Sequence, residues 1–299
     1  MRYQAALRPD NWILTAAFCG FRKATRPGWR YHVSCHCPSL GKRAHPPQFP
    51  MSEPHLPWLQ PGDAFPDSVW GEEDPAPGLV AAGGELDVDS LRRAYTQGIF
   101  PWFNDDQPIL WWSPAPRMVL QVADFRLHRS LQKNLQKFLA NPDCAIRIDT
   151  AFDAVIDRCA RSPRKGQPGT WIVPAMVRAY GELHRSGLAH SVEVWVGGKL
   201  AAGLYCVALG RAVFGESMFT DQTDGSKLAL AALVALCRAQ GVVLVDCQQQ
   251  TGHMASLGAE PISRDAFLAH LARATAQAPL QWEFSPLYWQ HILPSARHD

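Results

Sequence analysis

The sequence predicts an α+β fold in which a mostly antiparallel sheet is flanked by helices, with a small domain before it. Residues 192–196 and 200–208 are two strand patterns joined by a Gly-Gly-Lys turn, which is a hairpin signal, and residues 212–218 form a third strand. Residues 226–240 give a helix with almost no polar face, so it must be covered on most sides. Residues 242–245 are a continuous apolar run typical of a central strand.

Length, composition and charge limit the class of protein. With 299 residues, 47% of them hydrophobic, the chain can bury a sizeable core in one or two domains. No apolar run reaches transmembrane length, and the eight cysteines have no regular spacing, so we interpret them as reduced thiols of a cytoplasmic protein. Residues 1–50 hold eight Lys or Arg against a single acid, so the rest of the chain has a net negative charge.

Residues 1–58 are the first predicted segment, and they show no sustained hydrophobic period. The His and Cys residues between His32 and Cys37 are too tightly spaced for a usual zinc site and have no second ligand pair nearby, so we predict no metal site. One interpretation of the segment is a disordered extension. The interpretation that we favour is a true start at Met51, with the upstream residues absent from the native protein.

Residues 59–116 are predicted to form a small domain rich in aromatic residues. Asp87 is expected to cap a helix over residues 88–97. The segments 99–103 and 109–114 then bring three tryptophans within eleven positions, bracketed by prolines. Most tryptophans are ordinary core residues, but so many rings with so few aliphatic neighbours also suit a surface on which a base stacks.

Residues 117–276 are the third predicted unit, followed by a C-terminal tail over residues 277–299. The first part of this unit is the one basic region of an acidic body. A helix over residues 128–140 has an apolar face and, opposite to it, a stripe of basic residues. The stripe is either a solvated helix face or, as we favour, a contact to the phosphate backbone of a nucleic acid. It consists of Arg129, Lys133 and Lys137.

Three further helices complete the pattern. Thr150 is expected to cap a helix over residues 151–161, a second helix covers residues 174–186, and a last one covers residues 264–274. The order of helices, antiparallel strands, buried helix, strand and final helix resembles the GNAT-type acyltransferase fold. GNAT enzymes hold acetyl-CoA with a Gly-rich loop before the central helix, but here the loop ends in Lys227 and contains two acids, which disfavours CoA binding.

Two carboxylates follow neighbouring strand patterns. Glu216 lies near the end of the third antiparallel strand, and Asp246 comes directly after the apolar run 242–245. A buried carboxylate is costly unless it is hydrogen-bonded or neutralised, so each of them either holds structure or does chemistry. Acids at these two strand ends would line one cleft, where they would attract a cation.

Eight sequence blocks identify a family. The chain from about residue 65 to residue 271 resembles the leucyl/phenylalanyl-tRNA–protein transferases. The matching blocks, in order, are Gly78-Leu79 with Gly83-Gly84, Ala94-Tyr95, Gly98-Ile99-Phe100-Pro101-Trp102-Phe103, Ile109-Leu110-Trp111-Trp112-Ser113-Pro114, Gly169-Thr170-Trp171-Ile172, His190-Ser191-Val192-Glu193-Val194-Trp195, Gly215-Glu216-Ser217-Met218-Phe219 and Asp246-Cys247-Gln248.

The resemblance implies an enzyme that transfers Leu or Phe from aminoacyl-tRNA to proteins with N-terminal Arg or Lys, which marks them for degradation. Because a donor pocket that discriminates by shape gains only about 1 to 3 kcal/mol per methylene, weak transfer of Met is also expected. The partners are then Leu-tRNA, Phe-tRNA and the acceptor proteins. We expect no cofactor, no metal, no membrane association and a monomer in the cytoplasm.

The resemblance also implies roles for individual residues. Asp246 would take the proton from the α-ammonium group, Gln248 would orient the amine, and Glu216 would face the cationic acceptor side chain or orient Asp246. The residues around the terminal adenosine of the tRNA would be Trp102, Trp171, Tyr95 and Tyr180. The donor side-chain pocket would be lined by Leu204, Val213 and Met218. Two positions depart from the family pattern, Gly225 before the central helix and Cys206 after the hairpin tyrosine.

Three alternatives remain open at this point. The first is a GNAT-type N-acetyltransferase that uses acetyl-CoA, which would acylate without tRNA. The second is a non-catalytic tRNA-binding protein, which would tolerate loss of the two acids. The third is an enzyme that adds residues to cell-wall peptides, which would show no preference for N-terminal Arg or Lys.

Overall fold

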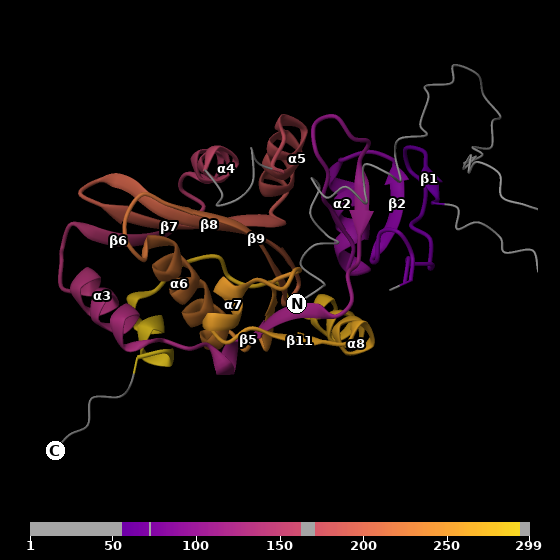
Figure 1. Cartoon of the computed structure of the whole chain (residues 1–299). Helices are drawn as coiled ribbons and strands as arrows, with labels where there is room; N and C mark the ends of the chain where they lie inside the picture. Colours follow the sequence, from indigo (N-terminus) through magenta and orange to yellow (C-terminus); the bar gives the residue numbers. More distant parts are fainter. Residues whose placement is uncertain (1–55, 72, 163–170, 294–299) are drawn as a thin grey trace, which may run out of the picture.

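The structure is a computed structural model that describes residues 56–71, 73–162 and 171–293. Residues 1–55, which include the predicted start at Met51 and the His and Cys cluster, lie outside the described residues. A small sheet with helix α2 lies at one end of the molecule, and a larger sheet extends away from it (Figure 1). Helices α4 and α5 cover one face of the larger sheet, while α3 and α6 lie on the other.

The small domain is built on a four-stranded sheet in the order β1-β2-β4-β3. The Asp87 carboxylate accepts a hydrogen bond from the backbone N–H of Ser90 at 2.7 Å, which confirms the predicted N-cap. The elements are β1 (Trp58–Leu59), β2 (Leu79–Gly83), α2 (Val88–Thr96), β3 (Phe100–Pro101) and β4 (Leu110–Trp112).

All three clustered tryptophans are buried, and Trp111 and Trp112 are the most completely covered. The indole N–H of Trp111 donates to the carbonyl oxygen of Gly83 at 2.9 Å, and that of Trp112 donates to the carbonyl oxygen of Trp102 at 2.7 Å. Both rings are only 1% exposed. The hypothesis of a base-stacking surface is therefore wrong for these two rings, which instead hold the small domain together.

The larger sheet has seven strands in the order β11-β5-β10-β9-β8-β7-β6. All neighbouring pairs are antiparallel except β9 and β10, which are parallel because helix α6 connects them. The predicted hairpin is confirmed, and its two turn glycines have positive φ. The strands are β5 (Arg117–Gln121), β6 (Cys144–Ile148), β7 (Ala189–Val196), β8 (Lys199–Leu209), β9 (Ala212–Thr220), β10 (Leu244–Asp246) and β11 (Glu260–Ile262).

The helices match the predicted pattern with small shifts of their ends. Helix α6 is buried along most of its length, as its apolar sequence predicts. In α3 the apolar face is buried and the basic stripe is exposed, which confirms the amphipathic pattern. The described helices are α3 (Arg129–Leu139), α4 (Phe152–Arg161), α5 (Pro174–Arg185), α6 (Gly225–Ala239), α7 (Gly252–Ser256) and α8 (Arg264–Thr275), with 3-10 turns η1 (Val122–Asp124) and η2 (Pro286–His291).

The predicted cap of α4 is wrong. The N-cap is Ala151, whose own side chain makes no capping hydrogen bond. The Thr150 hydroxyl donates instead to the buried carboxylate of Glu193, which also accepts the backbone N–H of Ala151 at 2.7 Å. An acid on the neighbouring sheet thus does the capping, and sequence proximity alone could not have identified it.

Alternate residues of β8 belong to two separate cores. Tyr205 and Val207 pack with α4, α5 and the small domain. Leu204 and Cys206 pack on the opposite face, where α6 lies. The segment predicted as a tail contributes to this second core, because Trp289 of η2 is buried against α6.

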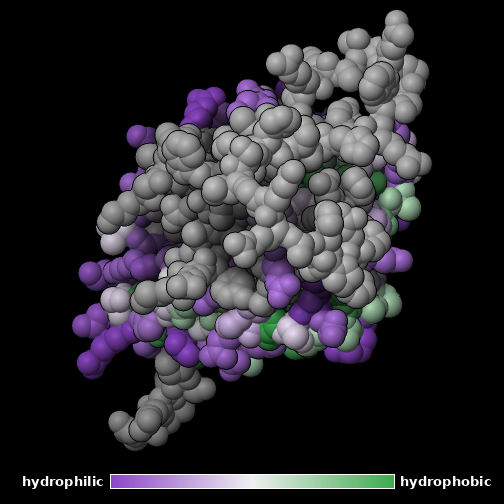
Figure 2. Space-filling model, turned by 45° about the vertical axis from the view of Figure 1, so that its right-hand side comes forward, coloured by the Kyte–Doolittle hydropathy of each residue, from purple (hydrophilic) through white to green (hydrophobic). Residues whose placement is uncertain are grey.

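The visible surface of the described residues in Figure 2 is largely hydrophilic, with hydrophobic residues in small separate areas. None of the helices in the described part of the chain has both the length and the apolar character needed to cross a bilayer.

Candidate active site around Glu216

A β-bulge sets the position of Glu216. In the ladder between β8 and β9, Tyr205 is opposite Ser217 and Cys206 is opposite Gly215, so Glu216 has no partner. Bulges of this kind re-aim a side chain and are common beside active sites. The last paired residues of the parallel strands β9 and β10 are Phe214 and Asp246, so the bulge lies just where the two strands part.

Three side chains from three different elements donate to the Glu216 carboxylate. Tyr95 of α2 donates its hydroxyl to Oε1 at 2.7 Å, and Gln248 donates its side-chain amide to the same oxygen at 2.8 Å. Tyr180 of α5 donates to Oε2 at 3.2 Å. The two tyrosine hydroxyl oxygens also lie within hydrogen-bonding distance of each other, a contact that competes with their bonds to Glu216 because each hydroxyl has a single proton. Four residues predicted for the site therefore meet at one point.

Burial changes the acidity of this cluster. Removal of the carboxyl from water raises the pKa of Glu216 to about 7, against the opposing effect of the Tyr95 hydrogen bond. The negative charge of Asp246 raises this pKa further, whereas Arg117 lowers it. Burial also raises the pKa values of Tyr95 and Tyr180 well above their usual value. Near neutral pH, Glu216 is therefore the member of the cluster that exchanges a proton.

Asp246 is held by a buried arginine. Arg117 Nε donates to Oδ1 at 2.8 Å and Nη2 donates to Oδ2 at 2.6 Å, and both side chains are only 1% exposed. The backbone N–H of Gln248 donates to Oδ1 as well, at 2.8 Å. Both oxygens of Asp246 are thus occupied by fixed donors, and this carboxylate faces no open space.

The other predicted residues lie in three places: the core that contains Tyr95 and Tyr180, the core on the opposite face of the sheet, and the surface. Trp102 is buried in the same core as Tyr95 and Tyr180, and Trp171 packs against that core. The proposed donor-pocket residues belong to the core on the opposite face of the sheet, where Leu204 and Val213 are buried and Met218 is partly buried. The basic stripe of α3 is exposed on the surface.

The two departures from the family pattern have structural consequences. Cys206 is fully buried in the core between the sheet and α6, two positions from Leu204 on the same face of β8. Burial raises the pKa of its thiol well above the usual value. Gly225 starts α6 so close to the sheet that a Cβ there would lie 2.7 Å from both the Ala202 Cβ and the Thr220 Oγ1. The glycine is therefore required by this close approach.

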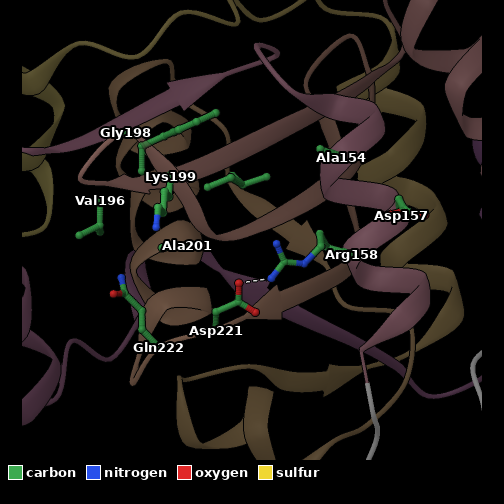
Figure 3. A pocket seen from close by; sticks show the side chains of 11 residues that line it. Ala154, Asp157, Arg158, Val196, Gly198, Lys199, Ala201, Asp221 and Gln222 are labelled. Atoms are coloured by element: carbon green, nitrogen blue, oxygen red, sulfur yellow. Dashed lines mark hydrogen bonds and ion pairs between the residues drawn. The ribbon is translucent and has the colours of Figure 1, made fainter.

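A separate pocket of about 630 Å³ lies between α4, the β7–β8 hairpin and the end of β9. Figure 3 shows Arg158 and Asp221 turned toward each other in this pocket, where they form an ion pair. Trp195 and Lys199 also line it. No residue predicted for the active site belongs to its lining. Among the residues that the structure describes, no group of His, Cys, Asp or Glu is placed to hold a metal ion.

Sequence reasoning missed Arg117. The residue was interpreted as part of a basic region, whereas it is one of the largest fully buried side chains. A usable signal was present, because Arg117 directly precedes the apolar run 118–120. An arginine at such a place is buried only with an acidic partner, and Asp246 follows a similar run.

Two sequence-family descriptions match the chain in order. One, leucyl/phenylalanyl-tRNA protein transferase, covers residues 119–272, and the other, the N-terminal domain of the same transferase, covers residues 84–115. The chain belongs to the leucyl/phenylalanyl-tRNA–protein transferase family. The two matches include Tyr95 and Tyr180 as well as Glu216 and Gln248, so the whole hydrogen-bonded cluster lies inside the family region.

Curated relatives agree with this family and are matched over nearly their whole length. A leucyl/phenylalanyl-tRNA–protein transferase of Albidiferax ferrireducens is 62% identical over 80% of this chain and 95% of the relative. Proteins of the same name are 59% identical in a Polaromonas species, over 81% and 96%, and 54% identical in Leptothrix cholodnii, over 79% and 95%. The chain is accordingly a transferase of this family.

Proposed function

We propose that the protein transfers Leu or Phe, and weakly Met, from aminoacyl-tRNA to the α-amino group of proteins with N-terminal Arg or Lys, which marks them for degradation. It acts as a monomer in the cytoplasm. The family assignment supports transfer of an aminoacyl group from tRNA to protein. The observation that carries the proposal is the environment of Glu216. This side chain is partly buried, its carboxylate faces three donors, and its pKa of about 7 suits proton transfer near neutral pH.

The reaction needs one proton acceptor and good positioning. The acceptor amine, with a pKa of about 7.7 to 8.0, attacks the ester carbon in its neutral form, an amide bond forms and the bond to the ribose oxygen breaks. The amine loses one proton during this attack, and the ribose oxygen gains one. A carboxylate with a pKa of about 7 is suited to pass this proton between them at neutral pH.

We assign this proton transfer to Glu216 rather than to Asp246, the residue that the sequence suggested. Asp246 is only 1% exposed and is paired with the Arg117 guanidinium, so an incoming amine cannot reach its carboxylate. Glu216 is partly accessible, and burial raises the pKa of its carboxyl to about 7. Asp246 then holds Gln248, whose side-chain amide orients Glu216 and the incoming amine.

The substrate subsites follow the family resemblance. Trp171, Trp102, Tyr95 and Tyr180 would lie around the terminal adenosine, on the same side of the sheet as Glu216. Because Tyr95 and Tyr180 are fully buried and Trp102 is 6% exposed, these three would form the base of the subsite, and Trp171 is the ring with accessible surface. The donor side chain would enter the core under α6, lined by Leu204, Val213 and Met218. The exposed stripe of α3 would contact the tRNA backbone.

A GNAT-like arrangement is part of this proposal. The parallel pair of β9 and β10, connected by α6 inside an otherwise antiparallel sheet, supports it. Because these two strands part beside Glu216, an aminoacyl group on one face would pass at this point toward the apolar side chains on the other face. This route would join the adenosine subsite to the donor pocket.

The test is transfer of labelled Leu, Phe or Met from charged tRNA to peptides that begin with Arg, Lys or Ala. We expect transfer of Leu and Phe to the Arg and Lys peptides, weak transfer of Met and none to the Ala peptide. Equal transfer to all three peptides would contradict the proposed acceptor preference. Acetylation of the same peptides from acetyl-CoA without tRNA would favour the N-acetyltransferase alternative instead.

A further inference from the structure

Arg117 lies where three parts of the fold meet. Its guanidinium group is packed between the rings of Phe100 in β3 and Phe267 in α8, with centroid distances of 5.0 and 4.6 Å. Two of its nitrogens donate to Asp246, and the third, Nη1, donates to the carbonyl oxygen of Gly98 at 3.0 Å. A planar group with donors in a rigid fork is suited to hold several partners in one geometry.

One branch of this network leads to Gln248. Asp246, fixed by Arg117, accepts the backbone N–H of Gln248 at 2.8 Å. At this point Gln248 has a φ of 58°, a left-handed conformation that residues other than glycine seldom adopt. From this conformation its side-chain amide reaches Oε1 of Glu216 at 2.8 Å. Asp246 therefore stabilises the strained backbone of Gln248, and this conformation directs the Gln248 side-chain amide to the Glu216 carboxylate.

The other branch leads to Tyr95. Gly98 accepts a hydrogen bond from Arg117 through its carbonyl oxygen. Its backbone N–H donates to the carbonyl oxygen of Tyr95 at 3.0 Å. Arg117 thus fixes the end of α2, the helix from which the Tyr95 hydroxyl reaches Oε1 of Glu216 at 2.7 Å. The two hydrogen bonds to this oxygen come from different parts of the fold, and one cation is linked to both.

We propose that Arg117 is a positioning residue of the active site, which holds Tyr95 and Gln248 in register so that both donate to Oε1 of Glu216. This inference rests on the proposed function, in which Glu216 moves the proton. A purely structural role explains the pair less well. Buried ion pairs are often replaceable by apolar residues without loss of stability, so burial alone gives no reason for a charged pair here.

The charged and titratable groups that face Glu216 are known from every element packed around it. They are Tyr95 from α2, Tyr180 from α5, Asp246 from β10, Arg117 from β5 and Cys206 from β8. Hydrogen bonds to the carboxylate favour its charged form. Loss of the Tyr95 and Gln248 bonds therefore raises the pH at which Glu216 titrates, and this shift is a readout that a purely structural role of Arg117 would not produce.

The test compares Arg117→Lys with Arg238→Lys. Lysine keeps the charge at position 117 but lacks the fork that holds Asp246 and Gly98 together. Arg238 is a matched control, because its guanidinium also donates three hydrogen bonds, all to backbone carbonyls of Val122, Ala123 and His291. It has no contact with the Glu216 cluster.

For Arg117→Lys we expect kcat of aminoacyl transfer to fall by about 10- to 100-fold, with the KM for charged tRNA within about threefold of the unmodified enzyme. The midpoint of Glu216 titration, followed by ¹³C NMR of labelled glutamate carboxyls, should move to higher pH by about half a unit or more. Arg238→Lys should leave both quantities unchanged. If the two variants behave alike in kcat and in midpoint, Arg117 has no positioning role.

A double variant, Arg117→Met with Asp246→Leu, keeps the test decisive should the single variant fold poorly. An apolar pair removes both buried charges together, which preserves folding better than removing one. We expect this variant to fold, as judged by circular dichroism, and to transfer at least 10-fold more slowly. Wild-type kcat in the folded double variant would overturn the inference. The NMR titration is independent of activity, so it still tests Arg117 if Glu216 proves not to move the proton.

Discussion

Replacement of Glu216 by Gln removes the proposed proton acceptor and keeps its surroundings. The amide oxygen can still accept from Tyr95 and Gln248, and the amide nitrogen can donate to the Tyr180 hydroxyl, so all three contacts of the carboxylate have a counterpart. What is lost is the ability to take a proton. We expect kcat at pH 8 to fall by about 100-fold or more, the usual contribution of general acid–base catalysis.

The pH dependence makes this prediction more specific. With a pKa of about 7, the ionised fraction of Glu216 falls to about half at pH 7 and about a tenth at pH 6, so kcat of the unmodified enzyme should show this acid limb in addition to the limb of the acceptor amine. The Gln variant should lack this limb and keep only the limb of the acceptor amine, near pH 8. The assay is single-turnover transfer of labelled Phe from Phe-tRNA to a peptide beginning with Arg, with ester hydrolysis measured without enzyme.

The same substitution should change stability with a defined sign. Because the folded pKa of Glu216 is above its ordinary value of 4.5, the folded state binds the extra proton between pH 4.5 and about 7, and stability is lost as pH rises through this window. The shift corresponds to about 3 kcal/mol. Urea denaturation should therefore find the Gln variant more stable than the unmodified protein at pH 8 and similar to it at pH 4.5.

Two results would refute this reasoning. The first is a Gln variant whose kcat is within about threefold of the unmodified enzyme across the pH range, which would exclude proton transfer by Glu216. The second is an unchanged acid limb in a slower variant, which would show that another group titrates near pH 7. Equal urea midpoints at pH 8 would mean that Glu216 is not desolvated in the folded protein.

Three further predictions concern other parts of the molecule. Asp246→Asn leaves Arg117 buried without its anion, so we expect a loss of about 3 to 5 kcal/mol in urea denaturation and about 100-fold slower transfer; unchanged stability would contradict the buried pair. Lys133→Ala with Lys137→Ala should weaken binding of charged tRNA and reduce its salt slope by about 2, and an unchanged slope would indicate a solvated face. Gly225→Ala should destabilise the protein by about 1 to 3 kcal/mol because of overpacking, and full stability in a urea titration would show that α6 can move.

Local patterns determined much of the fold. The apolar helix α6, the hairpin of β7 and β8 and the amphipathic α3 were all predictable, since each depends on a periodicity within a short segment. Strands β5, β6 and β11 of the larger sheet were not predicted, and neither were the four strands of the small sheet. The apolar run of β5 has only three residues and follows an arginine, β6 is an edge strand and only half-buried, and β11 has three residues, so the apolar signal of each is short or weak.

The sequence by itself determined the family and named Glu216, Gln248 and Tyr95, which lie in recognisable blocks, and Tyr180, which lies between two of them. Only the tertiary structure decided how they act together. The bulge that turns Glu216 toward the tyrosines depends on the register between two strands, and the partner of Asp246 is Arg117, which is 129 positions away in the chain. Strand register and the pairing of buried charges are set by packing of the whole fold, and no local pattern encodes them.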